Sequence, residues 1–418
     1  MKTDRLVRSA AVAAVLVLAA TACSTKADTS SERAGRGGVE MGPGVTDTTI
    51  TVGALTDLTG VYASLGRSIV NAQQLWAEQT NKTGGICGRR IEVTVKDHGY
   101  DVQRAVAAFA EIEPDSAMLT QVIGSPVVAA LKQDIEARRI LTVPMGWSSS
   151  LLGQAYVQVV GSTYDIDMIN GIDFLTRKAG LAPGDRVGHV YFEGEYGENA
   201  LAGAEYAARQ HGYRIVGQRI KATDTDLGAQ VTALRQAGVR AILVSAGPKQ
   251  TAALVGLAAA QGLTVPVLSS APGYAPQLLD SAAGPALEKM LYLVSGYPAP
   301  SAETARMRQL VQDYRARYPD APVDSGVVSG WMAAQVAAEA LTGACSAGKL
   351  TREGISAAHR SQRALDILDV PLDFTDAAAP STYRSYILKP AKDAAGGLTT
   401  VESAHETAAT LDYPLPKG

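Results

Sequence analysis

Short runs rich in β-branched and other apolar residues alternate with helical patterns along most of this 418-residue chain. In the helical stretches, apolar residues recur every three or four positions, as at Ile69, Ala72 and Trp76. Strands separated by helices of this kind form βαβ units, whose parallel strands are buried between helices. The alternation predicts an α/β protein with strands over 49–54, 90–96, 118–124, 140–145, 186–192, 214–220, 241–245, 265–269 and 290–295.

The C-terminal third distinguishes between two architectures that share this alternation, a single (β/α)₈ barrel and a pair of open doubly wound lobes. Helical stretches follow one another there, before the last short strands begin. The helices are expected over 302–318, 327–344 and 351–361, and the strands around 371–374, 383–388 and 399–402. A barrel alternates strand and helix throughout and would not close with this order. The sequence therefore predicts two doubly wound parallel-sheet lobes.

The N-terminus has the features of an exported lipoprotein. Basic residues within the first eight positions precede the apolar stretch 10–20, which is too short to span a membrane. The segment Ala20-Thr-Ala-Cys23 resembles a bacterial lipobox, in which cleavage leaves a cysteine that receives acyl chains. We therefore expect residues 1–22 to be a signal peptide. The lipid on Cys23 is expected to anchor the protein to the outer face of the cytoplasmic membrane, or in the periplasm.

Residues 23–46 are expected to form the lipidated start and a flexible linker, because Ser, Thr and Gly are frequent there and no periodicity is present. Export places the folded part in a compartment where disulfides persist. Cys87 and Cys345 remain once Cys23 is acylated. The sequence leaves open whether these two are free buried thiols or form a disulfide.

Several functional classes lack their usual marks. The net charge of −3 does not suit a nucleic-acid binder, whose affinity needs clustered Lys and Arg. No phosphate-loop, zinc-protease, nucleophile-elbow or dinucleotide motif is present, and the five histidines have no metal-ligand spacing. Asp165 and Asp167 are expected to cap a helix, with an acid/base role in a cleft hydrolase as the alternative. The sequence favours a binding protein without enzymatic activity, metal, cofactor or nucleic-acid partner.

Several segments in order along the chain point to a known family. Residues 50–66 read ITVGALTDLTGVYASLG, residues 81–89 read NKTGGICGR and residues 195–198 read EYGE. Later landmarks are Tyr314-x-x-x-Tyr318-Pro and Leu372-Asp-Phe374. In these segments the chain resembles leucine/isoleucine/valine-type substrate-binding proteins, the lipoprotein receptors of ABC importers.

The resemblance implies a type I periplasmic-binding fold, with two α/β lobes joined by three crossovers, here near Val160, Tyr297 and Pro380. It also implies a monomeric receptor that closes on a small polar molecule by hinge motion and delivers it to permease subunits. The expected ligand is an amino acid, or an organic acid or amide like one. A stand-alone ligand-sensing lipoprotein of the same fold is the alternative. The expected lobes are 47–160 with 297–380, and 161–296 with 381–418.

The binding site is expected at the carboxyl ends of the strands, where helix N-termini present unpaired N–H groups. Ser125 follows one strand and is expected to cap its helix, to bind the ligand, or both. By the resemblance, Gly146 and Ser148 hold the ligand carboxylate, and Tyr196 covers the ligand from the second lobe. The remaining candidates, each expected to face the cleft or to pack in the core, are Trp147, Tyr62 and Tyr274.

Two turns depart from the family pattern. The loop 270–274 lacks the acidic residue that usually meets a ligand ammonium, and the turn 246–249 lacks an aromatic residue. A buried ammonium without a carboxylate is costly. The ligand is therefore expected to be an organic acid or amide, unless another residue supplies the missing acid. The replacement partners are Lys249 and Tyr274 for an organic acid or amide, and Glu193 and Glu195 for an ammonium.

Overall fold

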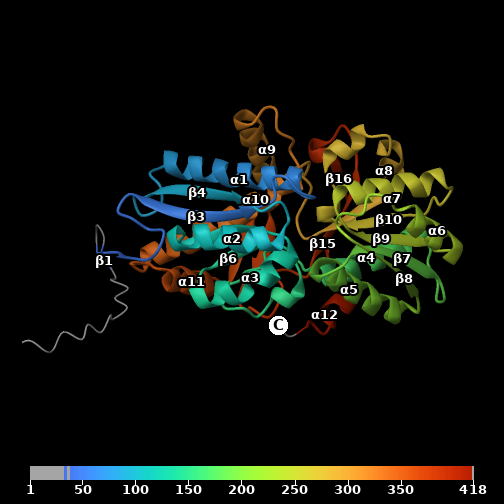
Figure 1. Ribbon diagram of the computed structural model, residues 1–418, viewed down its shortest axis with the longest axis horizontal. Coiled ribbons are helices and arrows are strands. Elements are labelled where there is room, and N and C mark those ends of the chain that lie inside the picture. Colours follow the sequence, from blue (N-terminus) through green and yellow to red (C-terminus); the bar gives the residue numbers. More distant parts are fainter. Residues whose placement is uncertain (1–32, 35–37, 417–418) are drawn as a thin grey trace, which may run out of the picture.

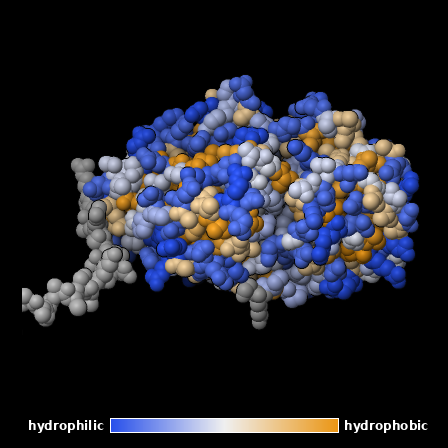
Figure 2. All heavy atoms as spheres, viewed as in Figure 1, coloured by the Kyte–Doolittle hydropathy of each residue, from blue (hydrophilic) through white to orange (hydrophobic). Residues whose placement is uncertain are grey.

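The computed structural model describes residues 33–34 and 38–416, which form two α/β lobes lying side by side along the long axis of the molecule (Figure 1). The predicted signal peptide and Cys23 lie outside the described residues. Within the described part, no helix is both long and apolar enough to cross a membrane. On the face drawn in Figure 2, hydrophilic residues predominate, with smaller groups of hydrophobic residues between them.

The first lobe is built on a four-stranded parallel sheet with the order β4-β3-β5-β6. Every residue of β5 and β6 is buried, as expected for parallel strands covered by helices. The strands are β3 (Thr49–Thr56), β4 (Arg90–Asp97), β5 (Met118–Ile123) and β6 (Thr142–Met145). The helices are α1 (Ala63–Lys82), α2 (Val102–Ile112), α3 (Ser125–Arg138), α9 (Ala305–Arg317), α10 (Ser325–Ser346) and α11 (Arg352–Ser361).

The second lobe contains a seven-stranded sheet with the order β16-β15-β11-β10-β9-β7-β8, in which β15 and β16 are antiparallel additions to a parallel core. The strands are β7 (Arg186–Phe192), β8 (Arg214–Ile220), β9 (Ala241–Ser245), β10 (Val267–Ser270), β11 (Leu291–Ser295), β15 (Ser385–Pro390) and β16 (Leu398–His405). The helices are α4 (Tyr164–Ala179), α5 (Glu195–His211), α6 (Gly228–Ala237), α7 (Pro248–Ala260), α8 (Gly284–Met290) and α12 (Ala408–Leu411).

Short elements complete the chain and connect the lobes. The 3₁₀ turns are η1 (Glu113–Asp115), η2 (Ser149–Leu151), η3 (Ala271–Gly273), η4 (Pro276–Asp280) and η5 (Ala395–Gly397). The minor strands are β1 (Arg33–Ala34), β2 (Glu40–Met41), β12 (Lys349–Leu350), β13 (Ala364–Ile367) and β14 (Val370–Asp373). The chain passes between the lobes after β6, after β11 and again between β14 and β15. The two open sheets and these passages are the predicted doubly wound architecture.

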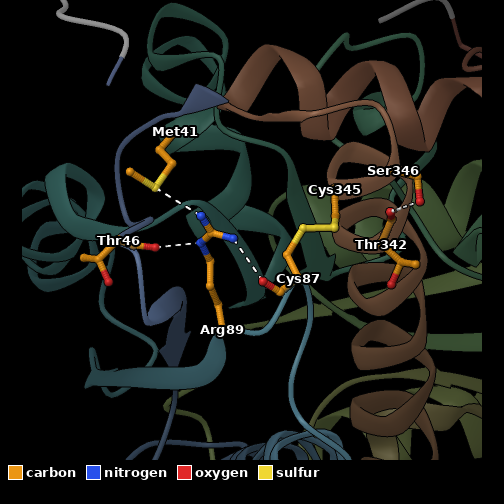
Figure 3. The surroundings of a disulfide bond; sticks show 7 residues. All are labelled: Met41, Thr46, Cys87, Arg89, Thr342, Cys345 and Ser346. Carbon is orange, nitrogen blue, oxygen red and sulfur yellow. Dashed lines mark hydrogen bonds between the residues drawn. A yellow bond between two sulfur atoms is a disulfide. The ribbon is translucent and has the colours of Figure 1, made fainter. Parts of the chain in front are cut away.

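Residues 40–46, the last part of the expected flexible linker, are held to the first lobe by backbone hydrogen bonds. Strand β2 pairs in parallel with β12, and the Glu40 N–H donates to the Gly348 carbonyl at 2.9 Å. The Arg89 Nε donates to the Thr46 carbonyl at 2.7 Å (Figure 3). The prediction of a linker reaching Thr46 is therefore wrong from residue 40 onward. Backbone hydrogen bonds hold this segment in place. Because such bonds do not depend on side-chain type, they produce no periodic pattern in the sequence.

Cys87 and Cys345 form a disulfide, with 5.9 Å between their Cα atoms (Figure 3). Cys87 lies in the turn before β4, and Cys345 lies in the last turn of α10. The bond therefore ties the start of the first lobe to the segment that returns to this lobe after the second crossover. The sequence left open whether these cysteines are free thiols or form a disulfide, and in the structure they are bonded to each other.

Candidate ligand-binding cleft

A small cavity, with a volume of about 40 Å³, lies between the lobes, at the carboxyl ends of strands from both sheets. Among the described residues, those lining it include no Asp, Glu, Lys, Arg or His. The first lobe contributes Tyr62, Leu65, Ile69, Tyr100, Ile123, Gly124, Ser125, Met145, Trp147, Ser325, Gly326 and Ser329. The second lobe and the connecting segments contribute Tyr164, Tyr196, Pro272 and Tyr297. The lining is therefore aromatic and aliphatic, with a few neutral hydroxyl groups.

Tyr62 is positioned by the loop between β3 and α1. The buried Asp57 carboxylate accepts the Tyr62 N–H at 2.8 Å and also the N–H groups of Thr59 and Gly60. At Gly66, a Cβ atom would lie 2.0 Å from the Asp57 carbonyl oxygen, so this turn of α1 requires glycine. The motif that suggested the family thus has a local physical cause, since it folds the loop that carries Tyr62 into the cleft.

Ser125 is the first residue of α3 and directly follows β5. Gly124, with φ of 98°, precedes it and supplies no side chain that could cap the helix. The Ser125 Oγ and the Tyr62 hydroxyl are buried and make no hydrogen bond of ordinary geometry among the described residues, although each lies beside a tyrosine hydroxyl, that of Tyr164 and that of Tyr100, respectively. An uncapped helix N-terminus carries about half a positive charge. This corner of the cavity therefore suits an oxygen-bearing ligand group.

Tyr196 closes the cavity from the second lobe. Its ring lies 4.5 Å from that of Tyr164, centroid to centroid, and its hydroxyl forms a hydrogen bond with the Ser270 hydroxyl. A Cβ atom at the next residue, Gly197, would lie 1.9 Å from the Phe192 carbonyl oxygen. The Tyr-Gly pair therefore lets α5 begin directly against the end of β7, which places the ring over the cleft.

Trp147 forms the wall where the lobes meet. Its indole N–H donates to the Val160 carbonyl at 2.8 Å, which fixes the ring at the first crossover. Its centroid lies 6.1 Å from that of Tyr164 and 6.2 Å from that of Tyr297. Aromatic rings at such distances stabilise one another in offset or tilted arrangements. The cleft is therefore a preformed aromatic enclosure.

Three expected site residues do not line the cavity. Gly146 lies against Ser125, where a Cβ atom would be 2.9 Å from the serine Oγ, so its role is close packing. The Ser148 hydroxyl lies within hydrogen-bonding distance of Ser150 Oγ, at 2.9 Å, and of the Glu195 carboxylate, at 3.4 Å. The Tyr274 hydroxyl donates to the Gly397 carbonyl at 2.7 Å. Each of these three residues contacts a partner within the protein in place of the cavity. A motif of neighbouring residues could not indicate those partners.

The charged candidates also lie outside the cavity. Glu193 and Lys249 are exposed, and Glu195 accepts a hydrogen bond from the Ser150 hydroxyl at 2.6 Å. This bond joins the segment after β6 to α5 of the opposite lobe, so Glu195 acts in lobe contact. The cavity-lining residues that were not among the expected site residues are Leu65, Ile69, Tyr100, Ile123, Gly124, Met145, Tyr164, Pro272, Tyr297, Ser325, Gly326 and Ser329. The composition contained one sign of the tyrosine-rich lining, because the chain has 16 tyrosines and only four phenylalanines.

Asp165 and Asp167 lie in the first turn of α4 and do not cap it, because the N-cap position belongs to Thr163. Asp165 accepts hydrogen bonds from Ser149 and Asn199, and Asp167 accepts one from Ser385 at 2.7 Å. Burial raises the pKa of Asp167 to about 7. Within the described residues, no group of His, Cys, Asp and Glu is arranged to hold a metal ion. The two carboxylates therefore serve the packing between the crossover and α4.

Asp324 caps α10 beside the cavity. Its carboxylate accepts the Gly326 N–H at 2.9 Å and the Ser68 hydroxyl at 2.9 Å, and burial raises its pKa to about 7. Because the folded state binds the proton more tightly than the unfolded state, this residue makes the protein less stable as the pH rises from about 4 to about 7.

We therefore expect Asp324→Asn to increase the free energy of unfolding at about pH 8 by on the order of 2 kcal/mol, with a much smaller gain near pH 4. The amide retains an acceptor for the Gly326 N–H but does not titrate. Urea unfolding of both proteins across this pH range measures the difference, in which other titrating groups cancel. Parallel pH profiles for the two proteins would show that Asp324 does not titrate as described.

Comparisons with known proteins agree with this architecture. A search of curated protein sequences found no match. The family model described as "Periplasmic binding protein" matches residues 49–395. The chain belongs to the periplasmic binding protein family. Its members and structural neighbours are receptors for solutes of ABC transporters, so this chain is an extracytoplasmic solute-binding protein and not an enzyme.

Among solved structures, the chain is similar to a fatty acid ABC transporter substrate-binding protein from Thermomonospora curvata. The two share 46% identity with a TM-score of 0.90, over 91% of this chain and 98% of that one. A branched-chain amino acid transporter protein from Thermus thermophilus with bound valine is 19% identical, with a TM-score of 0.76, over 87% of this chain and 98% of that one. A solute-binding protein from R. palustris in complex with benzoate is 19% identical, with a TM-score of 0.72, over 86% and 98%. The latter two show the type I periplasmic-binding fold.

Proposed function

We propose that this protein is the lipid-anchored receptor of an ABC importer and that its ligand is a monocarboxylic acid with an apolar body, of the fatty-acid class. The observation that carries the proposal is the uncharged lining of the cleft, in which tyrosine, tryptophan and aliphatic side chains surround a few hydroxyl groups. The resemblance to a fatty acid substrate-binding protein at 46% identity supports the same class.

An ordinary α-amino acid suits this cleft poorly. Its ammonium would be buried without a carboxylate partner, because the described lining has no acidic side chain and Glu193 and Glu195 lie elsewhere. Burying an unpaired charge is costly. A ligand with one polar end and an apolar body avoids this cost.

The polar end of the ligand is assigned to the corner formed by Ser125 and Tyr62. Their buried oxygen atoms lack well-formed hydrogen bonds, and the N-terminus of α3 favours negative charge without a Lys or Arg. The aromatic rings of Trp147 and Tyr196 then cover the apolar body. A carboxylic acid thus satisfies the hydroxyl groups and the apolar walls together.

A thermal-shift screen of the mature protein tests the ligand class. The panel contains saturated fatty acids of increasing length, benzoate, valine and valinamide. A ligand at about 100 times its dissociation constant adds about 2.7 kcal/mol of stability, which shifts the melting temperature visibly. We expect fatty acids to stabilise the protein and valine to have no effect. Stabilisation by valine alone would overturn the proposed class.

The lipid anchor rests on the lipobox ending at Cys23. We expect Cys23→Ser to abolish acylation, so that the chain no longer partitions into the detergent phase of a membrane extract. Metabolic labelling with a fatty-acid probe and phase separation measure the change. Full-length Ser346→Ala protein is the control, since it keeps all three cysteines and should keep the label. Wild-type labelling of Cys23→Ser would refute the anchor.

A further inference from the structure

Three consecutive serines, residues 148–150, form a turn that belongs to the first lobe, and we name it the serine turn. The chain before and after it is fixed to β6, since the Thr142 N–H donates to the Tyr156 carbonyl at 2.8 Å. Leu151 and Leu152, directly after the turn, are buried in the core of the first lobe. The serine turn therefore moves with the first lobe when the lobes separate.

The hydrogen-bond partners of the serine turn belong to the second lobe. The Ser150 hydroxyl donates to the Glu195 carboxylate at 2.6 Å. The Asn199 side-chain amide donates to Ser149 Oγ at 2.7 Å and accepts the Ser149 N–H at 3.3 Å. The Ser149 hydroxyl in turn donates to the Asp165 carboxylate at 2.6 Å. One turn of the first lobe is thus bonded to the first two turns of α5 and to the start of α4.

Other contacts between the lobes are of a weaker kind. The Gln277 side-chain amide donates to Ser64 Oγ at 3.2 Å, and Gln277 is exposed. Val61 packs against Gly247, where a Cβ atom would lie 2.5 Å from the valine methyl group. Hydrogen bonds to a charged acceptor are about twice as strong as those between neutral groups. The serine turn therefore carries the strongest of these polar contacts between the lobes.

The position of these bonds links lobe closure to the cavity. Glu195 directly precedes Tyr196, whose ring lines the cavity from the second lobe. Ser149 and Asn199 are buried, and Glu195 is half-buried. When the lobes separate, each of these groups must exchange its protein partner for water. The bonds to the serine turn thus stabilise the arrangement in which the Tyr196 ring covers the cavity.

We propose that the serine turn and the first two turns of α5 form a latch that holds the lobes together, with the bond between Ser150 and Glu195 as its outermost contact. The equilibrium between open and closed lobes is then set by the protein itself as well as by the solute. A solute has to supply less of the free energy of closure when the latch contributes to it. The inference depends on the role of the protein as a solute receptor and not on the class of its ligand.

Glu195→Ala tests the latch by a measurement that uses no ligand. Spin labels at Gln133→Cys and Gln210→Cys report the distance between the lobes, because both positions are exposed and lie on α3 and α5, which pack side by side across the boundary (Figure 1). The labels are placed in Cys23→Ser protein, whose two remaining cysteines form the disulfide. We expect Glu195→Ala to lower the ratio of closed to open lobes by about tenfold, the low end for a hydrogen bond to a charged group.

Glu198→Ala is the matched control, because Glu198 lies in the same first turn and pairs with Arg219 of its own lobe at 2.9 Å. Both variants remove one acidic group from the N-terminus of α5, so they change its interaction with the helix dipole alike. Glu198→Ala should leave the ratio of closed to open lobes unchanged. An equal effect of both variants, or no effect of Glu195→Ala, would overturn the latch.

Ser150→Ala provides a second test from the opposite lobe. It should lower the ratio of closed to open lobes as Glu195→Ala does, and the double variant should show little further loss, because both changes remove the same bond. Effects that add fully would show that the two residues act separately, which contradicts the proposal. Wild-type protein whose lobes are fully separated without ligand would also overturn it. The thermal-shift screen tests the ligand class independently of these outcomes.

Discussion

Replacing Cys87 and Cys345 together with alanine is expected to lower the free energy of unfolding by about 5–6 kcal/mol, the chain-entropy value for a loop of this length. The bond closes a segment of 258 residues, so its loss restores much conformational freedom to the unfolded chain. It also releases the turn before β4 from the end of α10. Thermal and urea unfolding of the oxidised wild type and the double variant measure the loss.

Two controls separate the bond from the side chains. The wild-type protein under reducing conditions should lose the same stability, whereas the double variant should not respond to reductant. The ligand affinity of the folded double variant should be unchanged, because neither cysteine lines the cleft. Equal stability of the reduced and oxidised wild type would contradict the expected contribution of the bond.

Tyr196→Ala is expected to weaken ligand binding by about 30- to 150-fold, which corresponds to about 2–3 kcal/mol of lost apolar contact. The ring covers the cavity from the second lobe and packs 4.5 Å from Tyr164. Without it, water enters the closed cleft beside the ligand. Titration calorimetry with the fatty acid that binds most tightly in the screen measures the change.

Two further variants locate the effect. Tyr196→Phe removes the hydrogen bond to Ser270 but keeps the ring, so it should cost much less affinity than Tyr196→Ala. Tyr206→Ala is the matched control on the same helix, because Tyr206 packs on Tyr413, at 4.9 Å, outside the cavity. If Tyr206→Ala weakens binding as much as Tyr196→Ala, the effect comes from α5 as a whole and not from the Tyr196 ring over the cavity.

The local pattern of the sequence determined most of the architecture. Parallel strands buried between helices appear in the sequence as short apolar runs, and the helices appear as apolar residues repeated every three or four positions. Loop chemistry was readable as well, since Gly66 and Gly197 stand where a Cβ atom would meet a carbonyl oxygen. Tyr62 and Tyr196, each near one of these glycines, line the cavity, and their contact with a ligand stays a prediction.

The tertiary structure alone decided which other residues meet. Tyr100, Tyr297 and Ser329 enter the same cavity from segments far apart in the chain, and no local pattern marks their approach. Likewise, Ser148 stands in an expected ligand-binding turn, yet its hydroxyl is directed to Glu195 of the opposite lobe. The sequence determines the order of helices and strands and the turns between them, because these depend on residues that are neighbours in the chain. The shape and polarity of the cleft depend on how two lobes pack, and that packing joins residues hundreds of positions apart.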